Sequence, residues 1–394
     1  MIIKEKVQQS VQLLKEFNLD CWITFVRETA INGDPTLPFL VAADLTWHSA
    51  VIVSASGAKI CIAGQYDKKS IEDLGVYDEV VGYVESIKRP LLDHLRRLHP
   101  STIALNFSKD SEISDGLTHG MYLTMVDYLK EIGMDDRIVS AEPIISALRQ
   151  RKSPSEIELI AEAVKRAEAV FRDVATFIRP GRTEAEVAEF MKNRVADQNL
   201  ELAWDPTVCP AVFTGPDTAG AHYNPTERVV KEGHVLNIDF GVKYKDYCSD
   251  LQRTFYILKK GETTAPAEVQ KGFATIVKSI EDSRRMLKPG ARGIDVDRAC
   301  RDVLAGNGYA EFPHALGHQV GRFAHDGTAL LGPGWEKYGK KPYATIEEGM
   351  VFTLEPRLLV PERGTVTIEE MVVVKKTGSE YLSDRQTNLI LISG

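Results

Sequence analysis

Four acidic residues stand at the ends of apolar segments in the second half of the chain. Asp239 ends the segment 231–239, and Glu355 ends a segment of similar pattern, 347–355, that lies 116 residues later. A further carboxylate, Asp250 or Glu369, follows on the expected return strand of each hairpin. Buried carboxylates are costly unless they are paired or bind a metal. We therefore expect the four acids to converge on divalent cations.

Three histidines lie between the two acidic pairs. His314, His318 and His325 are close in sequence, and Gly317 and Gly321 allow close approach of the backbone there. One imidazole among several carboxylates forms an oxygen-rich ligand set, which is typical of manganese, cobalt or iron(II) rather than of a thiolate zinc site. Two-metal sites hold their ions roughly 3.5–4 Å apart and activate water for hydrolysis. These residue types therefore indicate metal-dependent hydrolysis.

Each of these residues also has an ordinary structural interpretation when it is taken alone. An aspartate at the end of a strand is most often a turn or cap residue. A single histidine is more often a core residue whose hydrogen bonds are made within the protein. Cys209 and Cys248 fall near the expected site, but burial as small apolar side chains is the better interpretation for both. The matching positions of Asp239 and Glu355 in two similar segments favour metal binding over these alternatives.

An internal repeat explains how such distant acids could meet. The Pro-Gly pair at 180–181 separates two predicted helices, and a second pair at 289–290 separates two more, 109 residues later. Capping boxes, in which a Ser or Thr side chain and a Glu side chain satisfy free amides at a helix start, mark the first two helices. They are Ser153 with Glu156 and Thr183 with Glu186, and they predict helices over 154–178 and 184–199. A pseudo-twofold axis between the copies would bring the two hairpins together.

The first 150 residues have a different pattern, with mixed helices and strands. Apolar spacing predicts helices over 7–17 and 120–132 and strands over 21–26, 48–54, 59–63 and 102–106, the middle two forming a hairpin. The charged segment before Ser153 marks a boundary. We expect an α/β (α+β) protein with a mixed-sheet domain at 1–150 and a duplicated domain at 151–394.

Composition narrows the classes of function. The chain has 394 residues, a formal charge of −8 and no large excess of basic residues, which argues against a broad nucleic-acid or anionic-membrane surface. Its 5 cysteines form no CxxC pair, which is the pattern expected for a protein of a reducing compartment. The first residues lack the apolar core of a signal peptide, and no stretch is long enough to span a membrane. We expect a cytoplasmic protein.

The ordered set Asp239, Asp250, His318, Glu355 and Glu369 resembles the ligand set of the pita-bread metallopeptidases, which include methionine aminopeptidase, aminopeptidase P, prolidase and creatinase. The resemblance covers about 153–394. Its motifs are His222-Tyr-Asn-Pro, Asp239-Phe-Gly, Ser249-Asp250-Leu-Gln-Arg-Thr-Phe, Gly317-His318-Gln-Val-Gly, Leu354-Glu355-Pro and Ile368-Glu369-Glu370. Residues 1–150 resemble the additional domain of the prolidase, aminopeptidase P and creatinase branch.

This resemblance implies a dinuclear peptidase that cleaves Xaa-Pro bonds in small peptides, with a dipeptidase favoured over an aminopeptidase. The five ligands would hold two divalent cations, most simply Mn²⁺, with Co²⁺, Fe²⁺ or Zn²⁺ as alternatives. Asp250 and Glu369 would bridge the ions, and Glu355 would also move the proton of a bridging water that attacks the carbonyl. The resemblance further implies that His222 and His325 contact the substrate, that His314 lines the pocket, and that the protein is a homodimer.

The sequence departs from the resemblance at two positions. Prolidase-type enzymes usually have arginine two residues before the last metal glutamate, where this chain has Thr367, and glycine after the Glu-Pro pair, where it has Arg357. We expect Arg357 to supply the missing charge from the neighbouring strand and to pair with Glu370 or with the carboxylate of the substrate. A metal-free creatinase-type C–N hydrolase and a non-catalytic binding relic of the fold remain as alternatives, although both usually lose acidic ligands.

Overall fold

The structure is a computed structural model that describes residues 2–217 and 224–393. The chain divides into two compact units, Met1–Arg149 and Gln150–Gly394, which are described separately below. No helix in the described ranges is both long enough and apolar enough to cross a membrane.

The N-terminal unit is built on a six-stranded mixed sheet in the order β4-β3-β2-β1-β5-β6. β1 pairs antiparallel with β2 and parallel with β5, which confirms the expected mixed sheet and its central hairpin. The strands are β1 Cys21–Val26, β2 Ser49–Ser54, β3 Lys59–Gly64, β4 Glu79–Tyr83, β5 Ile103–Leu105 and β6 Ile138–Ser140. The helices are α1 Ile2–Glu16, α2 Leu37–Leu40, α3 Lys68–Glu72, α4 Lys88–Leu98, α5 His119–Lys130 and α6 Glu142–Gln150.

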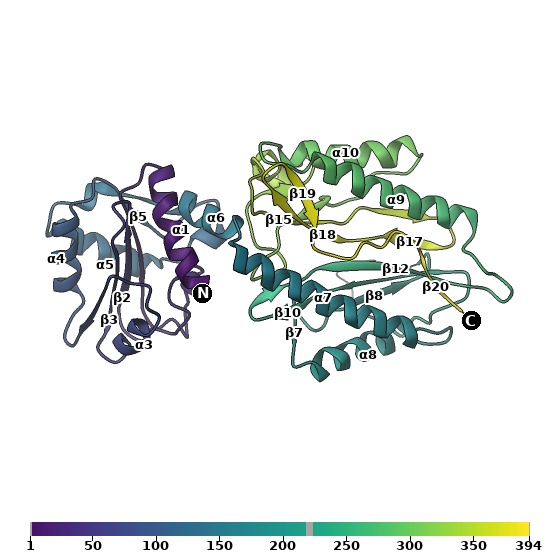
Figure 1. Ribbon diagram of the computed structural model, residues 1–394, viewed down its shortest axis with the longest axis horizontal. Coiled ribbons are helices and arrows are strands. Elements are labelled where there is room, and N and C mark those ends of the chain that lie inside the picture. Colours follow the sequence, from purple (N-terminus) through teal and green to yellow (C-terminus); the bar gives the residue numbers. More distant parts are fainter. Residues whose placement is uncertain (1, 218–223, 394) are drawn as a thin grey trace. The chain divides into compact units, whose positions relative to one another are not determined.

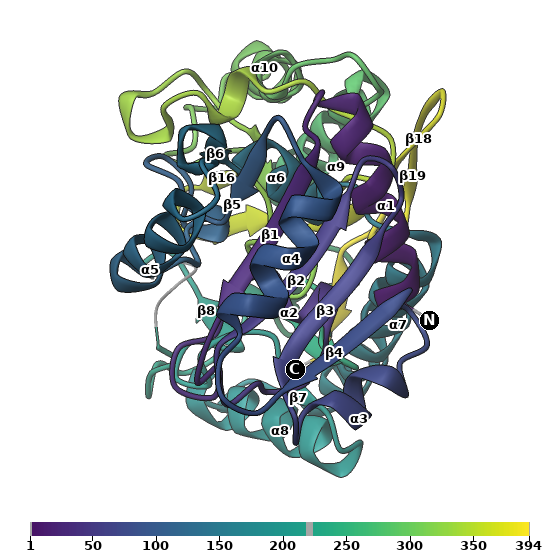
Figure 2. The same ribbon diagram turned by 90° about the vertical axis from the view of Figure 1, so that its left-hand side faces the viewer.

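Alternation along the strands gives this sheet two apolar faces, and each face is covered by helices. Trp22, Val51 and Val53 pack with α1, α2 and α6. Ile23 and Ile52 point the other way and pack with α4 and α5. Figure 2 shows α4 lying across the strands on one face of this sheet.

In the C-terminal unit, two helix pairs enclose the strands. α7 Pro154–Phe177 and α8 Glu184–Asp197 run along one side, and α9 Ala267–Met286 and α10 Gly293–Gly306 run along the other (Figure 1). Both expected capping boxes are present, at the starts of α7 and α8. The order of two helices followed by a strand hairpin occurs twice, as the repeat in the sequence predicts.

The strands of this unit form several small sheets. The central ones are β20-β12-β9-β8 and β15-β18-β19, with the hairpin β16-β17 between β15 and β18 in the chain. The strands are β7 Glu201–Leu202, β8 Ala211–Thr214, β9 Val235–Phe240, β10 Val242–Tyr244, β11 Tyr247–Cys248, β12 Leu251–Ile257, β13 Gly317–His318, β14 Leu330–Leu331, β15 Val351–Leu354, β16 Arg357–Val360, β17 Gly364–Thr367, β18 Glu370–Lys375, β19 Gly378–Tyr381 and β20 Ile390–Ile392.

Candidate metal centre

Two antiparallel strand pairs of the C-terminal unit carry the four acids at corresponding places. Asp239 lies in β9 and Asp250 directly precedes its partner β12, whereas Glu355 directly follows β15 and Glu369 directly precedes its partner β18. Gln252 lies opposite Asp239 in the β9–β12 ladder and forms an isolated bridge with Glu369. The backbone therefore joins the two strand pairs at the residues that bear the acids.

The side chains of these acids meet around one imidazole. His318 Nε2 lies 3.3 Å from Glu355 Oε1 and 3.7 Å from Asp250 Oδ2. One possible ligand atom each from Asp250, His318 and Glu369 lies within 4.8 Å of the others. The charge of Asp239 acts on Asp250, Glu355 and Glu369, so it belongs to the same group. The structure brings together all five residues that the sequence suggests as ligands, which we call the acidic cluster.

Burial and mutual repulsion disfavour ionisation of these acids. Burial alone raises the pKa of Asp239 to about 7. Burial, followed by the charges of neighbouring carboxylates, holds the pKa values of Asp250, Glu355 and Glu369 well above their ordinary range. A cation bound among the four would reverse this effect by favouring the ionised forms.

The polar atoms of the acidic cluster fit divalent metal ions. Asp239 Oδ1 and Glu369 Oε2 are buried and have no hydrogen-bond partner among residues 2–217 and 224–393. No lysine or arginine side chain of the described chain pairs with any of the four carboxylates. Buried acceptors without donors are costly, and four carboxylates with one imidazole form the hard donor set that divalent ions such as manganese bind.

Two polar neighbours that the sequence analysis did not identify orient Glu355. Gln252 donates to Glu355 Oε2 at 3.4 Å, and the Thr353 hydroxyl donates to Glu355 Oε1 at 3.4 Å. The amide of His318 in turn donates to the Thr353 hydroxyl at 3.1 Å. A signal for Gln252 was available, because residues 250 and 252 of an extended segment share one face.

A buried ion pair fixes the backbone beside Glu369. Arg253 donates to the Glu369 carbonyl at 2.9 Å and to Glu370 Oε2 at 3.3 Å. Glu370 also accepts from the Ser383 hydroxyl at 2.5 Å and from the Gln386 amide at 2.8 Å. The predicted pairing of Arg357 with Glu370 is therefore wrong, because Arg253 on β12 holds that carboxylate instead.

Arg357 itself is partly buried at the start of β16, directly opposite Thr367 on β17. Burial lowers the pKa of its guanidinium. No acidic side chain of the described chain pairs with it. Arg357 thus supplies a positive charge from the neighbouring strand, and this charge has no acidic partner among the residues that the structure describes.

The remaining histidines of the prediction have different surroundings. His325 contacts His318 edge-on, with 4.1 Å between ring centroids. His314 Nδ1 lies 2.8 Å from the Ala315 carbonyl, and its ring packs against Phe312. His222 lies outside the described residues, so its predicted contact with substrate stays a prediction.

Close packing explains the glycine before His318. A Cβ on Gly317 would lie 2.0 Å from the Thr353 carbonyl oxygen, so only glycine lets β13 pass beside β15 here. Cys209 and Cys248 are buried, as expected, and burial raises the pKa of each thiol to about 12. A neutral thiol is a poor metal ligand, which leaves the oxygens and the imidazole as the donors.

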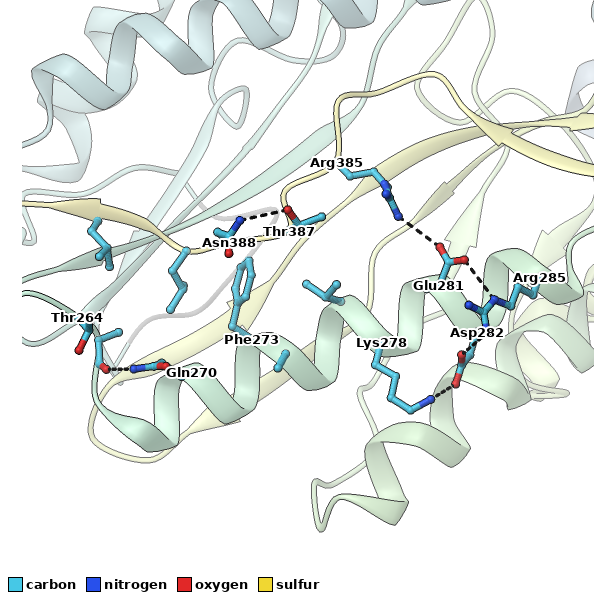
Figure 3. Close-up of a pocket in the computed structure, with 15 residues that line it drawn as sticks. Thr264, Gln270, Phe273, Lys278, Glu281, Asp282, Arg285, Arg385, Thr387 and Asn388 are labelled. Carbon is cyan, nitrogen blue, oxygen red and sulfur yellow. Dashed lines mark hydrogen bonds and ion pairs between the residues drawn. The ribbon is translucent and has the colours of Figure 1, made fainter.

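A separate groove of about 670 Å³ lies between α9 and the segment that leads into β20. Figure 3 shows Phe273 of α9 in this groove, with Arg385, Glu281 and Arg285 linked by ion pairs along it. None of the acidic cluster lines the groove. The chemistry suggested by the carboxylates therefore belongs to the strand pairs and not to this surface.

Comparison with known proteins identifies the family. Residues 158–376 match metallopeptidase family M24. The chain is 29% identical over 382 residues to a Mycoplasma genitalium protein named "Putative Xaa-Pro aminopeptidase", covering 96% of this chain and 97% of that one. It is 30% identical over 271 residues to a protein of the same name from Mycoplasma pneumoniae, covering 68% and 71% of the two chains.

Solved structures share the fold at lower identity. An X-Pro aminopeptidase from Thermotoga maritima superposes with a TM-score of 0.74 at 22% identity, over 97% of this chain and 100% of that one. An Xaa-Pro dipeptidase from Bacillus anthracis gives 0.72 at 23% identity, over 99% of each chain. The expected pita-bread fold is confirmed. The profile match and these relatives agree with the resemblance in the sequence, and the chain belongs to metallopeptidase family M24.

Proposed function

We propose that the protein is a dinuclear metal-dependent peptidase that hydrolyses Xaa-Pro bonds, and that it acts on dipeptides in preference to longer peptides. The observation that carries this proposal is the acidic cluster, in which buried oxygens of Asp239 and Glu369 have no donor in the described part of the chain. The names of the Mycoplasma relatives support the substrate class. Manganese is the preferred ion of the proposal because four of the five donors are carboxylates.

Within this proposal, Asp239, Asp250, His318, Glu355 and Glu369 would hold two cations, and Asp250 and Glu369 would serve as ligands of both. When bound, such ions supply the Lewis acidity that polarises a carbonyl and acidifies water. Glu355 takes up a proton from water and delivers it to the leaving nitrogen. Gln252 and Thr353 support this role because they fix both oxygens of its carboxylate.

Substrate contacts complete the proposal. His325 lies against His318, which supports a role in orienting the scissile carbonyl. His314, on the loop before β13, lines the substrate pocket in this proposal, and His222 provides a second contact. Proline makes the bond that is cleaved a tertiary amide without N–H, a feature that a pocket shaped for the ring can select.

The experiment that tests this function uses protein stripped of metal by a chelator and then reloaded with Mn²⁺ or Co²⁺. It is assayed with an Xaa-Pro dipeptide, a longer Xaa-Pro peptide and a Met-Ala peptide, and the metal content is measured in parallel. We expect two ions per chain and fastest cleavage of the Xaa-Pro dipeptide. Unchanged activity with fewer than one ion per chain would instead support the metal-free creatinase-type hydrolase.

We also propose that the protein is a homodimer. Large apolar side chains are exposed where β3 and β4 end and β2 begins: Trp47 (58%), Tyr66 (95%) and Val84 (85%). Such a group commonly marks an interface. Light scattering after size exclusion tests this, and a Tyr66→Ser, Val84→Ser variant is expected to shift the protein toward monomer.

A cytoplasmic location is consistent with the five free, buried cysteines.

A further inference from the structure

A buried ion pair on α10 lies beside the segment that leads into β13. Arg301 Nε lies 2.7 Å from Asp297 Oδ2, and the two side chains are only 9% and 2% exposed. Removing two charges from water is costly, and replacing a buried ion pair by apolar residues is often neutral or stabilising. The stability of the fold alone therefore does not account for this pair, and the groups that it contacts indicate another role.

Both members of the pair hold the backbone around His314. Arg301 donates to the carbonyl of His314 at 2.7 Å and to that of Phe312 at 3.0 Å. Asp297 Oδ1 accepts from the Leu316 amide at 3.1 Å. The guanidinium also lies over the Phe312 ring, 4.1 Å from its centroid, and that ring packs against the His314 ring at 5.0 Å. The pair thus fixes the main chain on both sides of His314 and the ring beside it.

The contact of Asp297 also fixes the hydrogen bond of the His314 ring. The Leu316 amide and the Ala315 carbonyl belong to one planar trans peptide unit, in which N–H and C=O point in opposite directions. Because Asp297 holds that N–H, it sets the direction of the Ala315 carbonyl, and His314 Nδ1 lies 2.8 Å from this oxygen. A carbonyl only accepts, so in neutral His314 the proton is on Nδ1, and Nε2 is the acceptor nitrogen.

The same segment contacts the metal centre. The Leu316 carbonyl accepts from the Glu355 amide at 2.8 Å, and His318 follows Leu316 by two residues. His314 is half-buried, which leaves part of its surface for contact with a bound peptide. The pair on α10 therefore holds His314 in a segment that is itself joined to the acidic cluster.

We propose that Arg301 and Asp297 are positioning residues that fix the ring orientation and the tautomer of His314 for substrate binding. This inference rests on the proposed peptidase function, in which His314 lines the substrate pocket. In the described part of the chain, the contacts of the pair are with the main chain before β13 and not with the acids of the cluster. Loss of the pair should therefore weaken substrate binding and leave the metal content unchanged.

A double-mutant cycle tests whether Arg301 acts through His314. Arg301→Lys keeps the charge beside Asp297 but lacks the planar fork that reaches two carbonyls. The manganese-loaded enzyme is assayed with Ala-Pro. We expect kcat/KM to fall roughly 10- to 100-fold in Arg301→Lys, mainly through KM, because a substrate-positioning group is misplaced. In a His314→Ala background the same change should cost no more than about two-fold, because residues that act as a unit are not additive. Equal losses in the two backgrounds would overturn the proposal.

Arg292 provides the matched control for the kinetics. It lies directly before α10 and pairs with Asp295 at 2.9 Å, but its side chain is 54% exposed. Exposed ion pairs contribute little, so Arg292→Lys should leave kcat/KM on Ala-Pro unchanged within about two-fold. A loss as large as that in Arg301→Lys would contradict a specific role for the buried pair.

NMR of the histidine rings gives a readout that does not depend on turnover. Long-range ¹H–¹⁵N spectra of chelator-treated protein distinguish protonated from unprotonated ring nitrogens, and the His314→Ala spectrum assigns the signals of His314. The variant Asp297→Leu, Arg301→Met removes both charges together, which a fold often tolerates. We expect the Nδ1–H tautomer of His314 in the wild type and a mixture of tautomers in this variant. A folded variant with unchanged His314 signals would contradict the positioning role, and the Arg301→Lys kinetics decide the question if the variant does not fold.

The two levels of the proposal fail in different ways. A wild type that cleaves no Xaa-Pro peptide in any metal-loaded state refutes the proposed function, whereas the ring signals still test the positioning of His314. A wild type that cleaves Ala-Pro, with a kcat/KM that Arg301→Lys leaves intact, refutes only the role of Arg301. A reduced metal content in Arg301→Lys would also count against it, because the pair would then support the metal centre and not His314.

Discussion

The acidic cluster should make the metal-free protein less stable as the pH rises. Burial raises the pKa of Asp239 to about 7, whereas its ordinary value is 3.8. Between pH 3.8 and about 7, the folded protein binds more protons than the unfolded chain. The free energy of unfolding therefore falls as the pH rises through the folded pKa. One pKa unit corresponds to about 1.4 kcal/mol, so full ionisation of Asp239 lowers the free energy of unfolding by on the order of 4 kcal/mol. Because the acids interact, the titration belongs to the cluster as a whole.

Bound metal should reverse this dependence. Ligands must lose their protons to bind a cation, so metal affinity rises with pH. An ion present at 100 times its Kd stabilises the fold by about 2.7 kcal/mol. We therefore expect Mn²⁺ to have little effect on thermal unfolding near pH 5 and a large stabilising effect near pH 7.5, where the cluster is ionised.

The assay is thermal unfolding of chelator-treated protein from about pH 4.5 to about pH 7.5, with and without Mn²⁺. Asp239→Asn removes one ionisable group and should flatten the pH dependence of the metal-free protein. Asp246→Asn is the matched control, because Asp246 is 69% exposed, pairs with Arg322 and is near Asp250 in sequence. The reasoning would be refuted if the difference in melting temperature between the metal-free wild type and Asp239→Asn did not change with pH.

Four other substitutions test the site. Asp250→Ala or Glu369→Ala should each lower turnover by several orders of magnitude and reduce metal content in elemental analysis, because both acids are proposed to be shared by the ions. Arg253→Leu should destabilise the fold in chemical denaturation by about 3–5 kcal/mol, since it leaves Glu370 buried without its cation. Gly317→Ala should lower the melting temperature and metal affinity, because its Cβ would collide with the Thr353 carbonyl; unchanged values in any of these measurements would contradict the assignment.

The sequence predicted those parts of the fold that depend on local chemistry. Ser153 and Thr183 begin their helices as expected, because a capping box needs only residues within one turn. The internal repeat also placed Asp239 and Glu355 correctly, since the two segments have the same pattern. By contrast, α4 was not predicted, because its many charged residues and Pro90 hide the apolar positions Leu91, Leu92 and Leu95.

The wrong pairing of Arg357 with Glu370 has a physical cause that sequence alone did not reveal. Glu369 and Glu370 are adjacent, so in an extended segment they point to opposite faces. Glu369 faces the acidic cluster, and Glu370 faces Arg253 and Glu168, which comes from α7. The partner of Glu370 is Arg253, which lies 117 residues earlier in the chain on β12, and no local sequence pattern records that contact.

The position of the cluster at the junction of the two repeats would give bound metals a structural role as well. The Glu369 amide donates to the Gln252 carbonyl at 3.1 Å, and this bridge joins β12 of the first repeat to the start of β18 of the second. Without cations, the acids of the two repeats repel one another across this junction. Bound cations would let the same acids hold the repeats together. Metal binding should therefore protect amides on both sides, in β9 and β12 as well as in β15 and β18, from hydrogen exchange. Protection confined to one repeat would show that the ions do not link the two halves.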